Sequence, residues 1–175
     1  MLVLGIDPGT ATTGFGLIKI APHDLIHINH GLIETSKEKL FEKRLHTIHL
    51  QLSRLIEDYS PDVMVMEKVF FSVNRKTAIR VSQAQGVILL TAGLYQVPVV
   101  EYAPGTIKKM VAGNGRSNKK EVQEAVKNIF DGKVKGIKGK MTHYDNEADA
   151  LAVALCHIFT SNENEFINNL FPTNV

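Results

Sequence analysis

Apolar residues recur along the chain with two different periods, and these periods predict its elements. Short apolar or alternating runs, each bounded by turn residues, predict five strands at residues 2–7, 14–20, 25–34, 62–67 and 98–102. Apolar positions at three- and four-residue steps predict helices at residues 38–58, 74–95, 106–111, 118–130 and 146–160. The polar residues that follow, 161–175, predict a C-terminal tail outside a single domain of residues 1–160.

The order of these elements, β-β-β-α-β-α-β-α, predicts the topology. Three consecutive strands with short connections form an antiparallel meander, and the strands that follow helices return parallel through right-handed crossovers. We therefore expect an α/β fold with a mixed five-stranded sheet and helices on both faces. This element order is similar to that of the ribonuclease H-like fold.

Composition narrows the class of protein. The 175 residues are 44% apolar and 22% charged, as in ordinary globular proteins, and no apolar run reaches the length of a membrane span. The N-terminal residues lack the pattern of a signal peptide. A single cysteine, Cys156, excludes an internal disulfide and is expected to be a small buried side chain on a helix. Together these features predict a cytoplasmic protein.

The net charge of +2 hides an uneven distribution. Residues 108–140 hold ten lysine and arginine residues against three acids, whereas the remainder is mildly acidic. A basic segment of this kind favours a polyanionic partner. A solvated lysine-rich surface is an equally good interpretation of the charge alone.

Acidic residues stand at the predicted ends of strands. Asp7 ends the first strand and Glu67 the fourth, and the carboxyl ends of parallel strands meet at one edge of an α/β sheet. The last helix adds Asp149, with Asn146 one turn earlier on the same face. Carboxylate and amide oxygens are the ligands preferred by Mg²⁺ or Mn²⁺, and two such ions catalyse phosphodiester hydrolysis.

Each of these residues also has a structural interpretation. Asp7 precedes Pro-Gly and suits the start of a turn, and Glu67 suits an exposed strand end. Asp149 suits the positive end of a helix dipole. Asn146 suits the N-cap of the last helix, with Asp149 three residues later as in a capping box.

Five segments resemble the RuvC family of bacterial Holliday junction resolvases, in the family's order. They are GIDPGTATTGFG, MEKVFF, NRKTAIRVSQAQGV, GNGRSNKKEVQ and EADALAVALCH. The resemblance implies a ribonuclease H-like homodimer that cuts four-way DNA junctions symmetrically with Mg²⁺, which Mn²⁺ can replace. It implies two ions per site, held by Asp7, Glu67, Asp149 and the position of Asn146, where the family has a fourth ligand that is usually Asp. It also implies work beside a branch-migration motor of the RuvA and RuvB type.

The same resemblance assigns DNA contacts. Phe70 matches an aromatic residue that stacks on an unpaired base near the crossover. Lys108 and Lys119 match basic residues near the scissile phosphates, where lysine makes binding dependent on salt. Further backbone contacts are expected from Arg75, Lys76, Arg116 and Lys120. The segment KVKGIKGK, residues 133–140, is a candidate additional contact or an insert.

Two other functions stay open at this point. The DPGTATTG turn resembles the phosphate-binding turn of actin-like and sugar-kinase ATPases, although the chain shows no second lobe. A junction-binding protein with weakened or no cleavage is the other alternative, and Asn146 is its only support. Three explanations of the asparagine itself stay open: a variation tolerated because an amide oxygen can still coordinate, the mark of a weakened enzyme, or an engineered replacement of aspartate.

Overall fold

The computed structural model describes residues 1–22, 24–68, 75–130 and 141–161, and of residues 75–77 and 141–146 only the backbone. Its elements are β1 Leu2–Asp7, β2 Thr12–Ala21, β3 Asp24–Glu34, α1 Phe41–Tyr59, β4 Val63–Glu67, α2 Arg75–Leu94, β5 Val99–Tyr102, α3 Pro104–Ala112, α4 Lys119–Ile129 and α5 Met141–Thr160. Each predicted element is present, and no end differs by more than five residues.

The strands form one mixed sheet in the order β3-β2-β1-β4-β5. β1, β2 and β3 are antiparallel neighbours, and β4 and β5 run parallel to β1. The predicted topology is therefore confirmed. In this order β1 lies at the centre of the sheet, with β4 directly beside it.

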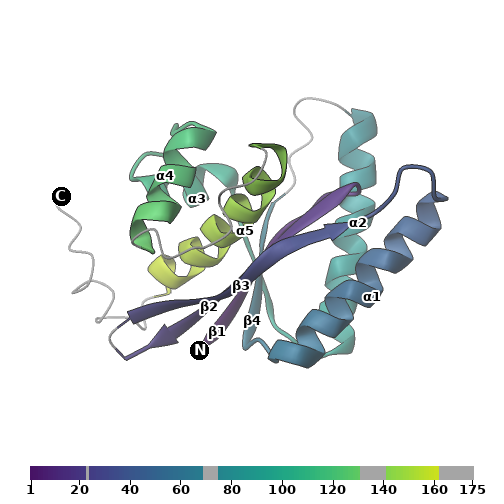
Figure 1. Ribbon diagram of the computed structural model, residues 1–175, viewed down its shortest axis with the longest axis horizontal. Helices are drawn as coiled ribbons and strands as arrows, with labels where there is room; N and C mark the ends of the chain where they lie inside the picture. Colours follow the sequence, from purple (N-terminus) through teal and green to yellow (C-terminus); the bar gives the residue numbers. More distant parts are fainter. Residues whose placement is uncertain (23, 69–74, 131–140, 162–175) are drawn as a thin grey trace.

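Helices cover both faces of the sheet (Figure 1), with α1 and α2 on one side and α3, α4 and α5 on the other. Successive residues of a strand point to opposite faces, and the two cores follow this rule. Leu4, Ile6 and Met64 pack with the α1–α2 side. Val3 and Val65 pack with the α5 side. By the same alternation, Asp7 and Glu67 belong to the face covered by α5.

Helix α5 lies very close to the central strands. A Cβ atom at Gly5 of β1 would stand 2.9 Å from the Cβ of Ala154 and would also collide with the carbonyl oxygen of Ala150. A Cβ at Gly16 of β2 would stand 2.7 Å from Cδ2 of Leu151. Glycine in the strands and alanine in the helix therefore allow the helix backbone to approach the sheet.

The start of α5 corrects two expectations. The helix begins at Met141, five residues before the predicted start, so Asn146 lies inside the helix and is not its N-cap. Asp149 stands in the third turn, beyond the reach of the N-terminal dipole. Both structural interpretations of these residues are wrong, because the sequence YDN, which suits a helix start, continues a helix already formed.

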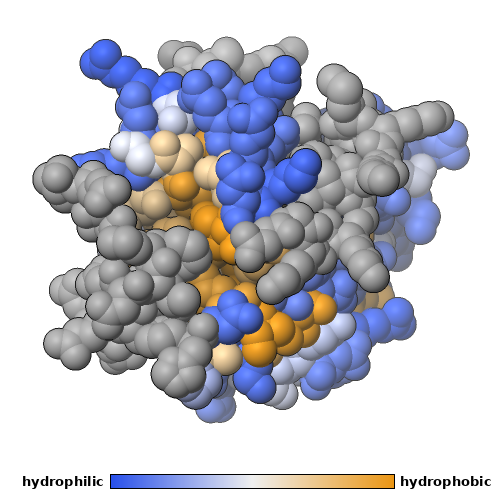
Figure 2. Space-filling model, turned by 60° about the vertical axis from the view of Figure 1, so that its left-hand side comes forward, coloured by the Kyte–Doolittle hydropathy of each residue, from blue (hydrophilic) through white to orange (hydrophobic). Residues whose placement is uncertain are grey.

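The side of the molecule that carries α3, α4 and α5 presents hydrophilic residues around an apolar area (Figure 2). Cys156, on the inner side of α5, is fully buried as expected, and burial raises the pKa of its thiol to about 11. None of the helices in the described ranges combines the length and hydropathy needed to cross a membrane.

Replacing Gly5 with alanine tests the close packing of α5. Because the added methyl group meets helix backbone, which cannot rotate away, we expect a loss of about 3 kcal/mol in the free energy of unfolding. Urea unfolding followed by circular dichroism measures it. Gly105→Ala is the control, since a Cβ there meets only the carbonyl oxygen of Gly115 at 3.9 Å. An equal effect of both changes would contradict the packing argument.

Candidate active site

Two carboxylates are brought together by the central strands. In the parallel pairing of β1 with β4, Ile6 lies opposite Met66. The next residues, Asp7 and Glu67, are the last of their strands. As predicted, neighbouring parallel strands therefore deliver both acids to the same edge of the sheet.

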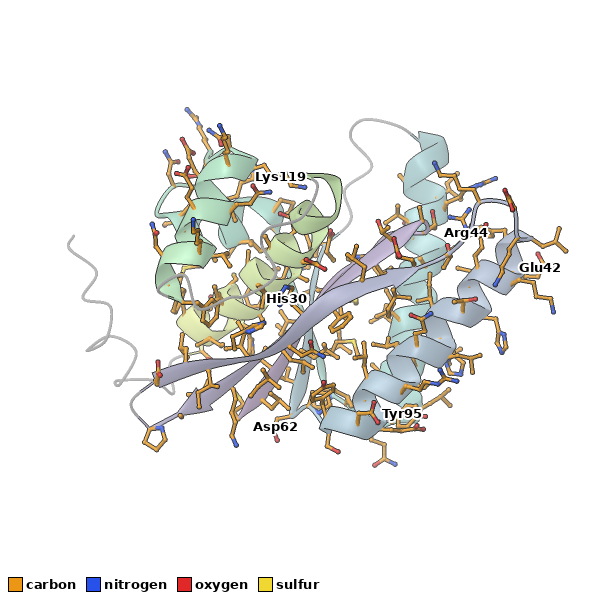
Figure 3. All side chains as sticks on the ribbon, viewed as in Figure 1. His30, Glu42, Arg44, Asp62, Tyr95 and Lys119 are labelled. Atoms are coloured by element: carbon orange, nitrogen blue, oxygen red, sulfur yellow. The ribbon has the colours of Figure 1, made fainter. Side chains whose placement is uncertain are left out.

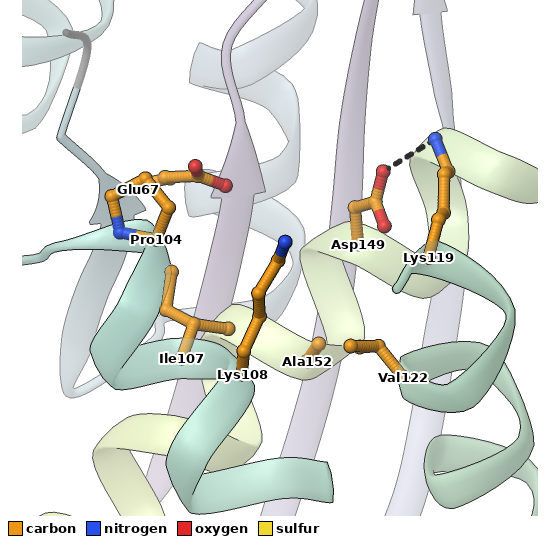
Figure 4. A pocket seen from close by; sticks show the side chains of 8 residues that line it. All are labelled: Glu67, Pro104, Ile107, Lys108, Lys119, Val122, Asp149 and Ala152. Carbon is orange, nitrogen blue, oxygen red and sulfur yellow. Dashed lines mark ion pairs between the residues drawn. The ribbon is translucent and has the colours of Figure 1, made fainter. Parts of the chain in front are cut away.

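Helix α5 delivers the third carboxylate. Glu67 and Asp149 line one pocket of about 210 Å³, together with Pro104, Ile107 and Lys108 of α3, Lys119 and Val122 of α4, and Ala152. Figure 4 shows the Lys108 side chain pointing toward the space between Glu67 and Asp149. The floor of the pocket is apolar and its walls carry opposite charges, which is the composition expected for a site that binds charged groups.

The three carboxylates repel one another. The pKa of Asp7 is raised to about 7, chiefly by burial and also by the negative charges of Asp149 and Glu67, while the positive charge of Lys119 lowers it. Burial and Asp149 also raise the pKa of Glu67. Carboxylates whose pKa is raised by desolvation and by like charges are typical of functional sites.

Lys119 compensates part of this charge. Its Nζ lies 2.8 Å from Oδ2 of Asp149 (Figure 4). A capping box fixes the start of α4: Asn118 Oδ1 accepts from the amide of Glu121 at 3.1 Å, and Glu121 Oε2 accepts from the amide of Asn118 at 2.8 Å. A lysine in the first turn is unfavourable for the helix dipole, so its pairing with Asp149 offsets that cost.

The other basic residues are less closely involved. Lys108, on α3, lowers the pKa of Glu67 by its positive charge. Arg116 and Lys120 are exposed beside Lys119, on the connection into α4 and on the helix itself. The structure thus gathers Lys108, Lys119, Arg116 and Lys120 on the side of the molecule that carries the carboxylates.

The donor set fits a divalent metal by its chemistry. Within the described residues, no three histidine, cysteine or acidic side chains converge closely enough to form a metal cluster, and Asp149 is held by Lys119. Asp7, Glu67 and Asp149 nevertheless offer only hard oxygen ligands, which suit Mg²⁺ and Mn²⁺. Their mutual repulsion is relieved by a cation placed among them.

Two contacts of charged side chains were not predicted from the sequence (Figure 3). His30 of β3 places its Nε2 3.7 Å from Oε2 of Glu147, which stands between the candidate ligands of α5. Arg44 of α1 is buried and donates to the backbone just after Asp7. The amphipathic pattern of α1 places Arg44 on the apolar face of the helix. A charged residue on that face is a sequence signal for a buried, hydrogen-bonded arginine.

Several expected site residues lie outside what the structure describes. Phe70 and the segment 133–140 are not among the described residues, and neither is the predicted tail beyond residue 161. Arg75 and Lys76 begin α2, but only their backbone is described. The same holds for Asn146, whose backbone lies in α5 one turn before Asp149. The roles assigned to these side chains remain predictions.

Comparison with known proteins identifies the family. The family model "Crossover junction endodeoxyribonuclease RuvC" matches residues 3–157. The chain belongs to the RuvC family. The RuvC protein of Syntrophomonas wolfei is 41% identical over 169 residues, which cover 97% of this chain and 95% of the relative. That of Pseudothermotoga lettingae is 38% identical over 162 residues, covering 93% and 96%.

Solved structures agree in fold. The RuvC of Thermus thermophilus, in complex with a Holliday junction substrate, matches with a TM-score of 0.80 and 30% identity over 91% of this chain and 93% of that chain. The yeast mitochondrial Holliday junction resolvase Ydc2 matches with a TM-score of 0.67 and 18% identity, over 88% and 76%. The ribonuclease H-like architecture predicted from the element order is thereby confirmed.

The raised pKa of Asp7 predicts how stability depends on pH without metal. The folded carboxyl keeps its proton up to about pH 7, whereas the unfolded carboxyl has the ordinary pKa of 3.8. Stability is therefore lost as pH rises from about 4 to 7, and the full cost is present above pH 7. Asp7→Asn removes this cost, and we expect it to stabilise the metal-free protein at pH 8 by up to about 4 kcal/mol.

Thermal unfolding in EDTA at pH 5 and pH 8 measures this effect, and the gain is expected to be clearly smaller at pH 5. Asp58→Asn, at an exposed position of α1, is the control and is expected to change little at either pH. Equal stabilisation by Asp7→Asn at both values would show that charge repulsion is not the cause.

Proposed function

We propose that this RuvC-family chain resolves four-way DNA junctions by paired, symmetric hydrolysis of two strands, using two Mg²⁺ ions per site. The observation that carries the proposal is the electrostatic coupling of Asp7, at the end of β1, with Glu67 and Asp149, the two carboxylates that line one pocket. The family is one of divalent-metal-dependent crossover junction endodeoxyribonucleases. The ATPase alternative is left without support by this membership.

Asp7, Glu67, Asp149 and the side chain at position 146 are the residues that would hold the metal. When bound, divalent ions activate a water for attack on phosphorus and stabilise the departing oxygen. The carboxylates would supply the negative charge that binds the ions. Lys119, which pairs with Asp149, reduces repulsion among the acids until the ions are present.

Positive charge around the pocket suits a DNA backbone. Lys108 lines the pocket, Lys119 stands at its rim, and Arg116 and Lys120 are exposed beside it. We assign these residues to phosphate contacts, which steer the junction onto the site and make affinity dependent on salt. Arg75 and Lys76, at the start of α2, and Phe70, as a base-stacking residue, complete the proposed DNA surface.

A homodimer is proposed through α2. This helix turns Ala84, Ile88 and Ala92 into the core, and it exposes Leu90 at 61% and Leu94 at 63%. Ile79 is exposed as well, and at Gly86 and Gly93 an added Cβ would meet nothing within 4 Å. An apolar stripe with glycines suits close packing of a second copy, and twofold symmetry then places one site on each of two opposed strands.

The motor of the RuvA and RuvB type and a cytoplasmic location are part of the same proposal. Membership of the RuvC family, which the family model shows over residues 3–157, supports both.

Cleavage of an immobile four-way junction tests the function. We expect Asp7→Asn to bind the junction with unchanged affinity and to lose Mg²⁺-dependent cleavage by at least about a hundredfold, because the ions lose a buried ligand. Asn146→Asp in the same assay addresses the alternative of weakened or absent cleavage. A large gain in rate would identify the chain with Asn146 as a weakened enzyme, and cleavage by Asp7→Asn at the normal rate would overturn the metal site.

A charge on α2 tests the dimer. Leu90→Glu places a carboxylate in the proposed apolar interface, and we expect monomers in analytical ultracentrifugation and nicking of single strands in place of paired cuts. Leu50→Glu is the control, since Leu50 is 43% exposed on the neighbouring helix α1. If Leu90→Glu leaves the sedimentation of the protein unchanged, α2 is not the interface.

A further inference from the structure

A buried arginine lies beneath the loop that follows Asp7. Arg44, in the first turn of α1, is only 6% exposed. Its guanidinium is always charged, and burial of a charge is unfavourable unless partners compensate it. In the described part of the chain, no carboxylate forms an ion pair with it. Its partners are a backbone carbonyl and a hydroxyl.

The contacts of Arg44 form a closed ring (Figure 3 labels Arg44). Its Nη2 donates to the carbonyl oxygen of Thr10 at 2.6 Å, and its Nε donates to Oγ1 of Thr35 at 2.9 Å. The Thr35 hydroxyl in turn donates to the same Thr10 carbonyl at 2.5 Å. Both acceptor positions of that carbonyl are therefore used, and the Thr35 hydroxyl acts as acceptor and donor at once.

The ring belongs to a set of contacts that hold the whole loop between β1 and β2. The amide of Thr35 donates to the carbonyl of Ala11 at 2.9 Å. The hydroxyl of Thr13 donates to the carbonyl of Gly9 at 2.7 Å. The backbone carbonyls of residues 9, 10 and 11 therefore all accept hydrogen bonds from side chains or amides of the protein. Such a dense set fixes the path of the chain immediately after Asp7.

We propose that Arg44 and Thr35 are positioning residues that hold Asp7 in the orientation needed for metal binding and cleavage. Neither residue touches the substrate in this role. The cation that lowers the pKa of Asp7 is Lys119, so Arg44 acts through the loop geometry and not through its charge. The inference rests on the proposed function, because Asp7 must be a metal ligand for its orientation to affect cleavage.

Thr35→Val is the sharpest test, since it keeps the shape of the side chain and removes the hydroxyl. We expect kcat for junction cleavage to fall about tenfold or more, because small displacements of a catalytic group are costly. The Mg²⁺ concentration for half-maximal cleavage is expected to rise, and the rise in melting temperature on adding Mg²⁺ to shrink. Junction affinity in EDTA is expected to stay within about twofold of the wild type.

Conservative changes and a control complete the experiment. Thr35→Ser keeps the hydroxyl and is expected to restore kcat and the Mg²⁺ dependence. Arg44→Lys keeps the charge but not the two-point contact, and is expected to resemble Thr35→Val. Thr47→Val is the control, because the Thr47 hydroxyl donates only within α1, to the carbonyl of Lys43 at 2.9 Å.

The outcomes separate the inference from the proposed function. If Thr35→Val and Arg44→Lys lower only the melting temperature, with the kcat and Mg²⁺ dependence of the folded protein unchanged, the ring is merely structural and the inference is overturned. If the wild type does not cleave, the proposed function fails, while the Mg²⁺-induced rise in melting temperature still tests the positioning of Asp7. If Arg44→Lys does not fold, the comparison of Thr35→Val with Thr35→Ser decides whether the ring positions Asp7.

Discussion

The close approach of α5 to the central strands is the constraint on which the rest of the structure depends. It exists because Gly5 and Gly16 lack side chains where Ala150, Leu151 and Ala154 press against the sheet. A helix held at an ordinary distance from the sheet would move Asp149 away from Asp7, since a side chain of fixed length spans little extra distance. The glycines therefore act on the chemistry although none of them takes part in it. The site is as much a product of backbone packing as of its acids.

The repulsion among the carboxylates is the second constraint. It opposes the close packing of α5, which brings these charges together. Packing three carboxylates at one edge of the sheet raises the pKa of Asp7 and of Glu67, so the fold bears an electrostatic cost. Lys119 and Lys108 reduce this cost without removing it, because each ammonium carries a single charge. A divalent ion carries twice the charge of one ammonium group, and so offsets more of the repulsion among the carboxylates. A divalent ion bound among these carboxylates, as proposed, would recover the stability given up at this edge of the sheet.

Much of this arrangement was predictable from sequence, for reasons that are local. Apolar runs bounded by turn residues predicted the strands, and the ends of the runs placed Asp7 and Glu67 at strand ends. The start of α5 was missed because its first turn has no apolar periodicity, and the acids near Asn146 looked like a helix start. The pairing of Lys119 with Asp149 and the ring around Arg44 were not predicted. Both join segments far apart in sequence, and no local pattern reports which distant partner a charged side chain meets.

The position of Asn146 inside α5 sharpens the meaning of its amide. As an N-cap it would have had a structural reason to be asparagine, but a residue in the second helical turn has no such reason. What remains is its place one turn before Asp149, on the helix that closes the site. If position 146 is a ligand as proposed, an aspartate there would add a negative charge to a group in which burial and repulsion already raise the pKa of two acids. The amide would keep an oxygen for coordination without that charge, so it would weaken the attraction for the metal and reduce the repulsion in the metal-free fold.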